Sequence, residues 1–185
     1  MPAKLLIAVV VMLLVGCASS PRNVILHPQY QGNSSNQLPL SIALQVNDLR
    51  TTKYTIRVKD QEPALYMPDA NLPLNFQDVM QQALVAHGAE VSGNAATQLE
   101  VDITRFKAII TESLSQHQSQ ANAEVTVRVT QGTRRFEKQY QGNANLTGPL
   151  QHSQAGVEQQ LNQLAQHVVS RIVQDPELIK FVRGS

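Results

Sequence analysis

Apolar and polar residues alternate along several separate segments of this chain, and this alternation limits the folds that the chain can adopt. In residues 40–47, apolar side chains occupy every second position, and the residues between them are small or polar. Comparable segments follow at residues 54–58, 99–103, 125–129 and 136–144. Because successive side chains of a strand point to opposite faces, each segment predicts a strand with one buried face. Such strands are typical of an antiparallel sheet whose second face is open to water.

Two segments have the periodicity of amphipathic helices. The first covers about residues 73–87, begins at a proline and is followed by Gly88, which suits a left-handed C-terminal cap. The second covers about residues 153–174 and carries its apolar residues on one stripe, and residues 176–182 indicate one more short helical turn. Between the helices, the alternation changes phase near Arg105, which predicts a β-bulge.

These elements together predict an α+β fold. Their order is strand, strand, helix, three strands, helix, which gives a mainly antiparallel sheet of about five strands. Two amphipathic helices are enough to cover one face of such a sheet, so we expect a two-layer sandwich with both helices on one face. Residues 40–185 are expected to form this single domain, and a chain of this size buries enough surface to fold without disulfides.

The amino-terminal residues have the pattern of a secretory signal. An apolar run at residues 5–15 follows the positive charge of Lys4 and is too short to span a bilayer. Cys17 is the one cysteine of the chain. It is the last residue of the sequence LVGC, residues 14–17, which begins inside the end of this run. These four residues resemble the bacterial lipobox, in which the cysteine is acylated and becomes the first residue of the mature chain. We expect residues 1–16 to be a cleaved lipoprotein signal peptide; a plain signal peptide or a buried free cysteine is the alternative.

Acylation would consume the thiol of Cys17 and exclude nucleophilic, redox and disulfide roles for it. Each buried methylene contributes about 0.8 kcal/mol, so several acyl chains together hold a protein stably at a membrane. Residues 17–39 are rich in Ser, Asn, Gln and Pro, and we expect them to be a flexible tether with a reach of about 25 Å. The apolar patch at residues 24–26 is a candidate for a short docked edge strand.

Charge excludes one class of partner. Without residues 1–16 the chain has 14 basic and 14 acidic side chains, because only Lys4 is lost from the 15 basic residues. Scattered basic residues in a neutral chain argue against a nucleic-acid surface. The partners that remain are the membrane, reached through the acyl chains, and another envelope protein or peptidoglycan.

Candidate catalytic residues are few, and no metal or cofactor motif is present. Ser113, Ser115 and His117 place a nucleophile and a base in one segment, but its composition is that of a polar hairpin tip. Glu100 and Asp102 share a strand face at about 7 Å, a separation found in inverting glycosidases. Opposite charges on the neighbouring strands favour cross-strand ion pairing instead. We therefore expect no catalytic residue, metal site or cofactor.

Six segments of the chain, taken in order, carry a family resemblance. They are the lipobox around Cys17, LSIALQVNDLR, NLPLNFQDVMQQALVAHGAEV, TQLEVDITRFKAIITES, the hairpin into KQYQGNANL, and DPELIKFV. This ordered set resembles the YajG family of bacterial lipoproteins. The resemblance implies an envelope lipoprotein with no established biochemical activity, and only Cys17 carries over, as the acylation site. Ala18 after it resembles the sorting signal for the outer membrane, which implies a domain in the periplasm.

Two kinds of function are compatible with these features. The first is a non-catalytic, lipid-anchored binding or structural module that uses either an exposed edge strand or the open sheet face. That face is expected to contain Arg57, Lys59, Glu100, Asp102, Thr104, Glu124, Arg128 and Arg135. The alternative is a small hydrolase or ligand-binding protein acting on peptidoglycan or lipid. It requires a pocket between helices and sheet, lined by Phe76, Met80, Phe106 and Tyr140.

Overall fold

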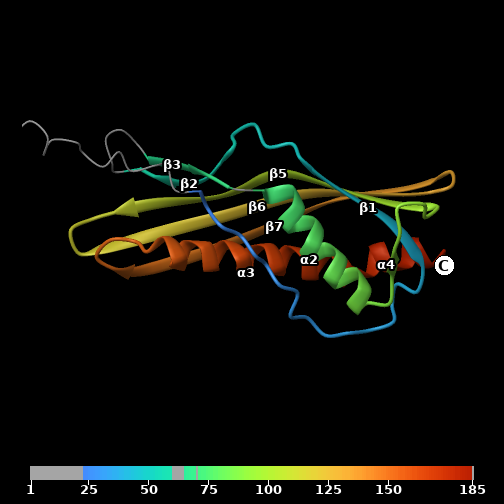
Figure 1. Ribbon diagram of the computed structural model, residues 1–185. Helices are drawn as coiled ribbons and strands as arrows, with labels where there is room; N and C mark the ends of the chain where they lie inside the picture. The colour runs from blue at the N-terminus through green and yellow to red at the C-terminus, as the bar shows by residue number, and fades with distance from the viewer. Residues whose placement is uncertain (1–22, 60–64, 70, 185) are drawn as a thin grey trace, which may run out of the picture.

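The computed structural model describes residues 23–59, 65–69 and 71–184, which form one mixed seven-stranded sheet with helices on one face (Figure 1). The predicted signal peptide, Cys17 and Ala18 lie outside these residues. The strands are β1 (Ser41–Asp48), β2 (Tyr54–Val58), β3 (Leu65–Pro68), β4 (Glu90–Val91), β5 (Thr97–Glu112), β6 (Gln116–Gln131) and β7 (Arg134–Pro149). The helices are α2 (Leu72–Ala86), α3 (Gln154–Val173) and α4 (Pro176–Arg183).

The sheet is organised around β5. One edge of β5 pairs with β6, antiparallel, over its full length. The other edge is shared, because β1 pairs in parallel with residues 97–103 of β5, and β2 pairs in parallel with residues 108–110. β1 and β2 therefore lie end to end along β5. The remaining strands extend the sheet outward: β7 pairs with β6, β4 with β1, and β3 with β2.

The sheet differs from the predicted one in two respects. β1 and β2 run parallel to β5, whereas the sequence predicts a mainly antiparallel sheet, and there are seven strands rather than about five. Alternation identifies the buried side of a strand but not the direction of its neighbour. The two strands without a sequence signal, β3 and β4, have four and two residues, too few for a period to be visible. The third helix, α4, occupies the place of the predicted short helical turn.

Several local predictions are confirmed. α2 and α3 begin and end within one residue of their predicted bounds. Gly88 has a φ of 92°, the left-handed conformation expected after α2. The register between β5 and β6 shifts between Ile103 and Arg105, where the sequence predicts a bulge. Because of this extra residue, Ile103 and Phe106 are both buried although they are three positions apart.

The helices pack on one face of the sheet and leave the other uncovered (Figure 1). α3 packs tightly on Gly142 of β7, where an added Cβ would be 2.8 Å from Val168 and 2.9 Å from Leu164. Phe76 of α2 packs edge-to-face on Phe106 of β5, with ring centroids 5.2 Å apart. Within the described residues, no helix combines the length and the apolar character that crossing a membrane requires.

Residues 23–39, which we call the strap, run across α2 and α3 (Figure 1). The sequence predicts a flexible tether here, but Val24, Leu26 and Leu38 are buried in the core. Alternate residues are buried from position 23 to 28, and Val24 forms an isolated parallel bridge with Asp69. The apolar patch therefore docks as an extended segment. The polar composition of the strap does not indicate that it docks, because the side chains that hold it belong to the helices and not to the strap itself.

Side chains of α3 supply the hydrogen bonds that hold the first part of the strap. The backbone N–H of Ile25 donates to Glu158 at 2.9 Å, and that of His27 donates to Asn162 at 3.0 Å. Gln154 donates to the first carbonyl of the strap at 3.2 Å. Since these three side chains are four residues apart, they lie on one helix face. That face replaces the partner strand that an extended segment would otherwise need.

Candidate functional site

A charged cluster lies on the uncovered face of the sheet. The register places Asn47 of β1 opposite Asp102 of β5. It also places Arg128 of β6 between Glu100 of β5 and Glu137 of β7. All five residues occupy the alternate positions that point away from the helices. The pairing that buries the apolar face therefore also assembles this cluster.

Arg128 is the centre of the cluster. Its guanidinium forms ion pairs with Asp102, with Glu137 at 3.0 Å and with Glu100 at 3.4 Å. Asn47 donates to Glu100 at 3.0 Å and to Asp102 at 2.9 Å. The hydrogen bonds to Asp102 and then Glu137 raise the pKa of Arg128. The Asp102 side chain is only 2% exposed, so its hydrogen bonds come from these two donors rather than from water.

This geometry does not favour acid–base catalysis by Glu100 and Asp102. A general acid at neutral pH needs a carboxyl group whose proton is retained, usually in an apolar pocket. Both carboxylates instead accept hydrogen bonds from Arg128 and Asn47. The cross-strand ion pairing that the sequence favoured is the arrangement that the structure contains.

Two adjoining depressions flank the cluster, and we call them together the open-face groove. One has a volume of about 450 Å³ and is lined by Gln98, Glu100, Arg128, Val129, Thr130, Arg135, Phe136 and Glu137. The other has a volume of about 410 Å³ and is lined by Ala43, Leu44, Gln45, Gly93, Gln98, Leu99 and Glu100. Arg135 forms no ion pair with any residue that the structure describes. Its guanidinium is therefore the part of the groove with unused binding capacity.

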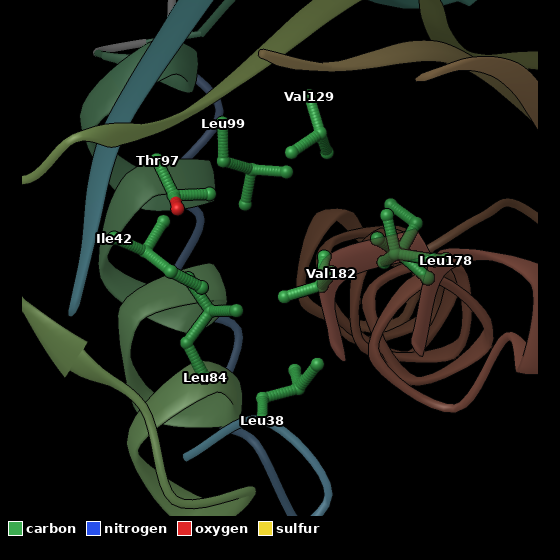
Figure 2. A pocket seen from close by; sticks show the side chains of 9 residues that line it. Leu38, Ile42, Leu84, Thr97, Leu99, Val129, Leu178 and Val182 are labelled. Atoms are coloured by element: carbon green, nitrogen blue, oxygen red, sulfur yellow. The ribbon is translucent and has the colours of Figure 1, made fainter. Parts of the chain in front are cut away.

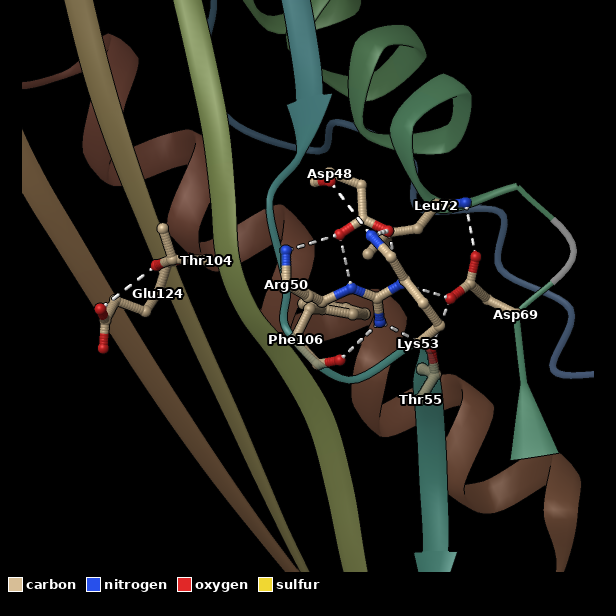
Figure 3. Close-up of polar contacts among 9 residues, drawn as sticks. All are labelled: Asp48, Arg50, Lys53, Thr55, Asp69, Leu72, Thr104, Phe106 and Glu124. Carbon is tan, nitrogen blue, oxygen red and sulfur yellow. Dashed lines mark hydrogen bonds and ion pairs between the residues drawn. The ribbon is translucent and has the colours of Figure 1, made fainter. Parts of the chain in front are cut away.

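The other residues of the predicted face lie outside the groove. Glu124 is paired with Arg105 at 3.4 Å. It also accepts a hydrogen bond from Thr104 at 3.2 Å, which Figure 3 shows. Arg57 and Lys59 belong to β2 and the residue after it, about 23 Å further along β5 than Asp102. The structure thus brings Glu100, Asp102 and Arg128 together beside Arg135 and keeps the remaining four apart from them.

A second polar cluster, which no sequence pattern indicated, fills the gap between β1 and β2 (Figure 3). The Arg50 side chain, 4% exposed, binds Asp48 at 2.9 Å and Asp69 at 2.8 Å. It also donates to Thr55 and to the carbonyl of Phe106, both at 3.1 Å. The gap leaves this carbonyl of β5 without a strand N–H, and the guanidinium takes the place of that donor.

The Arg50 cluster stabilises the charged forms of Asp48 and Arg50. Burial alone would raise the pKa of Asp48, but hydrogen bonds from Arg50 and Lys53 lower it to about 2. Burial would lower the pKa of Arg50, and its bonds to Asp48 and Asp69 raise it instead. Asp69 also accepts from the backbone N–H of Leu72, at the start of α2, at 2.8 Å. Since every group has partners and joins separate elements, the role of this cluster is structural.

The pocket that a hydrolase would need between helices and sheet is filled by side chains. Its expected lining residues, Phe76, Met80, Phe106 and Tyr140, are each at most 4% exposed. A cavity of about 10 Å³ lies nearby, between α2, α4 and the sheet, and Thr97 is the one polar residue in its lining (Figure 2). This is about the volume that one water molecule requires, which is too small for a substrate.

Ser113, Ser115 and His117 do not form a nucleophile and base. The Ser113 hydroxyl donates to the carbonyl of Gln116 at 2.9 Å. His117, expected in a solvated loop, is buried on the helix-facing side of β6, and its Nδ1 donates to the carbonyl of Leu150 at 3.2 Å. In the part of the chain that the structure describes, no three His, Cys, Asp or Glu side chains are placed to hold a metal ion.

Comparison with known proteins places this chain in a family. The model of a family described as "Uncharacterized lipoprotein" matches residues 28–183. The chain therefore belongs to this family of lipoproteins, which are lipid-anchored proteins of the cell envelope. It is similar to the uncharacterized lipoprotein YajG of Escherichia coli strain K12, with 20% identity over 179 residues, 95% of this chain and 93% of that protein. The predicted family resemblance is confirmed.

Two solved structures are similar to this chain at low sequence identity. Protein XCC0632 from Xanthomonas campestris has a TM-score of 0.54 and 14% identity, covering 86% of this chain and 96% of that chain. The rare lipoprotein B from Shewanella oneidensis has a TM-score of 0.46 and 10% identity, covering 78% and 99%. The first likeness supports the α+β fold and, at this identity, the fold alone.

Proposed function

We propose that the protein is a non-catalytic module, anchored by lipid to the cell envelope, that binds a polar partner in the open-face groove. In this proposal residues 1–16 are removed, Cys17 is acylated, and the domain faces the periplasm from the outer membrane. Family membership supports the lipid anchor, and Ala18 supports the outer membrane.

The contrast between the two faces of the sheet carries the proposal. Helices and strap cover one face, whereas β5, β6 and β7, each of sixteen residues, leave the other uncovered. The pairs of Arg128 with Glu100 and Glu137 are exposed and contribute only about 0–1 kcal/mol each, so stability alone gives little reason for these two pairs. Arg135, at the edge of this cluster, has no ionic partner among the described residues. A partner that supplies a carboxylate to Arg135 would complete the arrangement.

The groove favours partners that are rich in hydrogen-bond acceptors. Arg128 and Arg135 present guanidinium groups, and Gln98 and Thr130 add an amide and a hydroxyl. A polar segment of another envelope protein carries suitable carboxylates and carbonyls, and so does the peptide of peptidoglycan.

Photo-crosslinking in cells tests the groove and distinguishes these partners. A photo-reactive residue at Thr130 should give products that protease digestion removes if the partner is a protein, and that muramidase digestion releases if it is peptidoglycan. Arg135→Glu is expected to lower the yield several-fold, because it makes an unpaired cation an anion and leaves the pairs of Arg128 in place.

Arg183→Glu is the matched control, since it makes the same change of charge on α4, on the helix side of the sheet. It should leave the yield unchanged. The comparison is with the chain that carries the photo-reactive residue and neither substitution. If that chain, Arg135→Glu and Arg183→Glu all give equal crosslinking yields, the groove is not the binding surface.

The proposal that the protein is non-catalytic has a separate test. Two observations support this proposal: side chains fill the space between helices and sheet, and Glu100 and Asp102 accept hydrogen bonds. The purified acylated protein is therefore expected not to cleave muropeptides. Cleavage that is lost in a Glu100→Gln variant would establish the hydrolase alternative.

A further inference from the structure

We infer that a tip formed by the β5–β6 turn and the β7–α3 loop inserts into the bilayer that holds the acyl anchor. We define the tip as residues 113–116 and 148–151. The inference rests on the acylation of Cys17 proposed above, and it assigns one end of the domain to the lipid surface. Three features support it: two exposed leucines, the backbone of one of them, and the route of the strap.

Leu114 and Leu150 expose more of their side chains than any other large apolar residue of the described chain. Their exposed fractions are 102% and 66%. The backbone N–H of Leu150 donates to the carbonyl of Ser115 at 3.0 Å, which holds the loop against the turn. The β5–β6 turn and the β7–α3 loop lie at the end of the molecule away from the C-terminus (Figure 1). No tip residue is charged, so the tip can enter an apolar medium without burying an ion.

Leu150 is held in a backbone conformation that leucine rarely adopts. Its φ of 58° makes it the one non-glycine residue of the described chain in the left-handed region. Its N–H is bound to Ser115, and its carbonyl accepts from the ring of His117 at 3.2 Å. Glycine or asparagine would adopt this conformation more easily. The exposed leucine side chain adds nothing to the stability of the fold at this strained position. We therefore look for its role in a contact with something outside the protein.

The strap brings the anchor to the same end of the molecule. Gln154, four residues after Leu150, donates to the carbonyl of Asn23 at 3.2 Å. Asn23 is six positions after Cys17, and a chain of that length spans at most about 20 Å. The acyl chains are therefore confined to the neighbourhood of the tip. A flexible tether of the predicted length would not impose this restriction.

Tryptophan fluorescence tests the contact directly, because the chain contains no tryptophan. A full-length, acylated Leu114→Trp variant is reconstituted into vesicles of phosphatidylethanolamine and phosphatidylglycerol with brominated acyl chains. We expect blue-shifted emission and quenching several-fold stronger than in Val85→Trp. Val85 is the matched control because it is also exposed, at 56%, but lies on α2 near the far end of the strap.

A second variant separates membrane contact from folding. Leu150→Asn, made in the Leu114→Trp chain, should leave the free energy of unfolding unchanged or higher, because asparagine tolerates a positive φ. It should also reduce the quenching of the reporter, because one of the two inserted side chains is lost. Quenching unchanged by Leu150→Asn would remove Leu150 from the contact and overturn the two-leucine tip.

Mass analysis of the same samples separates the two levels of the proposal. If Cys17 is acylated and the Leu114→Trp reporter is no more quenched than Val85→Trp, the tip does not insert, although the anchor stands. A tip covered by another protein gives this same result. If Cys17 carries no acyl group, the proposed anchor fails, and the inference fails with it.

Discussion

Arg50 takes the place of a strand residue at the point where β1 has ended and β2 has not begun. Its guanidinium binds the carbonyl of Phe106 and two carboxylates, and its side chain is 4% exposed. A charge this deeply placed stabilises the fold only while its partners are present. The cluster therefore makes the junction of β1, β2, β5 and α2 depend on one side chain.

Removal of that side chain should be strongly destabilising. We expect Arg50→Met to lower the free energy of unfolding by about 3–5 kcal/mol, because Asp48 and Asp69 would lose the buried guanidinium that binds both of them, and Asp48 would keep only the exposed Lys53. Urea denaturation measures this. Lys53→Met is the control: Lys53 also binds Asp48, at 3.0 Å, but is 63% exposed, and its loss should change stability by less than about 1 kcal/mol. Equal effects of the two substitutions would contradict the structural role given to Arg50.

The residues of the candidate site differ in how far the sequence could identify them. Alternation alone places Glu100, Asp102 and Arg128 on the open face. It does not identify Asn47 and Glu137 as their partners, because those contacts depend on which strands are neighbours and in what register. The same limit applies to the Arg50 cluster, which exists only because two parallel strands share one edge of β5.

Among the elements, those defined by local signals were predictable and those defined by distant contacts were not. Helix bounds follow from periodicity, a first-turn proline and the cap at Gly88, all within a few residues of one another. The strap has no such signal. Its extended residues are held by Glu158 and Asn162, more than 130 positions away in the chain. A polar segment was therefore mistaken for a solvated one.

His87 fixes the second half of the strap to the end of α2. Its Nε2 lies 2.7 Å from the hydroxyl of Tyr30, and its Nδ1 lies 2.7 Å from that of Ser35. Burial lowers the pKa of His87 below its ordinary value of 6.5. The unfolded chain then binds a proton more readily than the folded one. The stability from His87 is therefore complete above about pH 6.5 and decreases as the pH falls through the folded value.

Acidification should loosen the strap before it affects the sheet. The backbone N–H groups of Ser35 and Leu38 donate to carbonyls at the end of α2, both at 2.9 Å. Between pH 7.5 and 5.5 we expect their protection against hydrogen exchange to fall several-fold relative to amides of β6. In His87→Gln, which does not titrate, this relative change should disappear. A change that persists in the variant would exclude His87 as its cause.

For the molecule as a whole, composition and pattern gave the α+β class, one helix-covered face and one open face. They did not give the parallel pairing of β1 and β2 with β5, since strands that bury one face look alike in either direction. The docking of the strap was also missed. It joins positions 133 and 135 residues apart, and such contacts form late because long loops must close first.

The strap should dock late in folding, because its partners on α3 are far from it in the sequence. The strap binds a surface that α3 provides, and α3 in turn packs on β6 and β7. In pulse-labelled hydrogen exchange during refolding, we expect the amides of Ile25 and His27 to become protected after those of β5 and β6. Protection of all four groups at the same time would show that the strap docks together with the sheet.

Late docking of the strap would matter for the lipid anchor proposed above. In that proposal an acylating enzyme acts on Cys17 before α3 has packed, when residues 23–39 are not yet held against the helices. Once α3 is in place, the strap fixes Asn23 beside Gln154, and Asn23 is only six positions after Cys17. The same stretch of chain would thus allow modification before it binds and set the orientation of the finished domain afterwards.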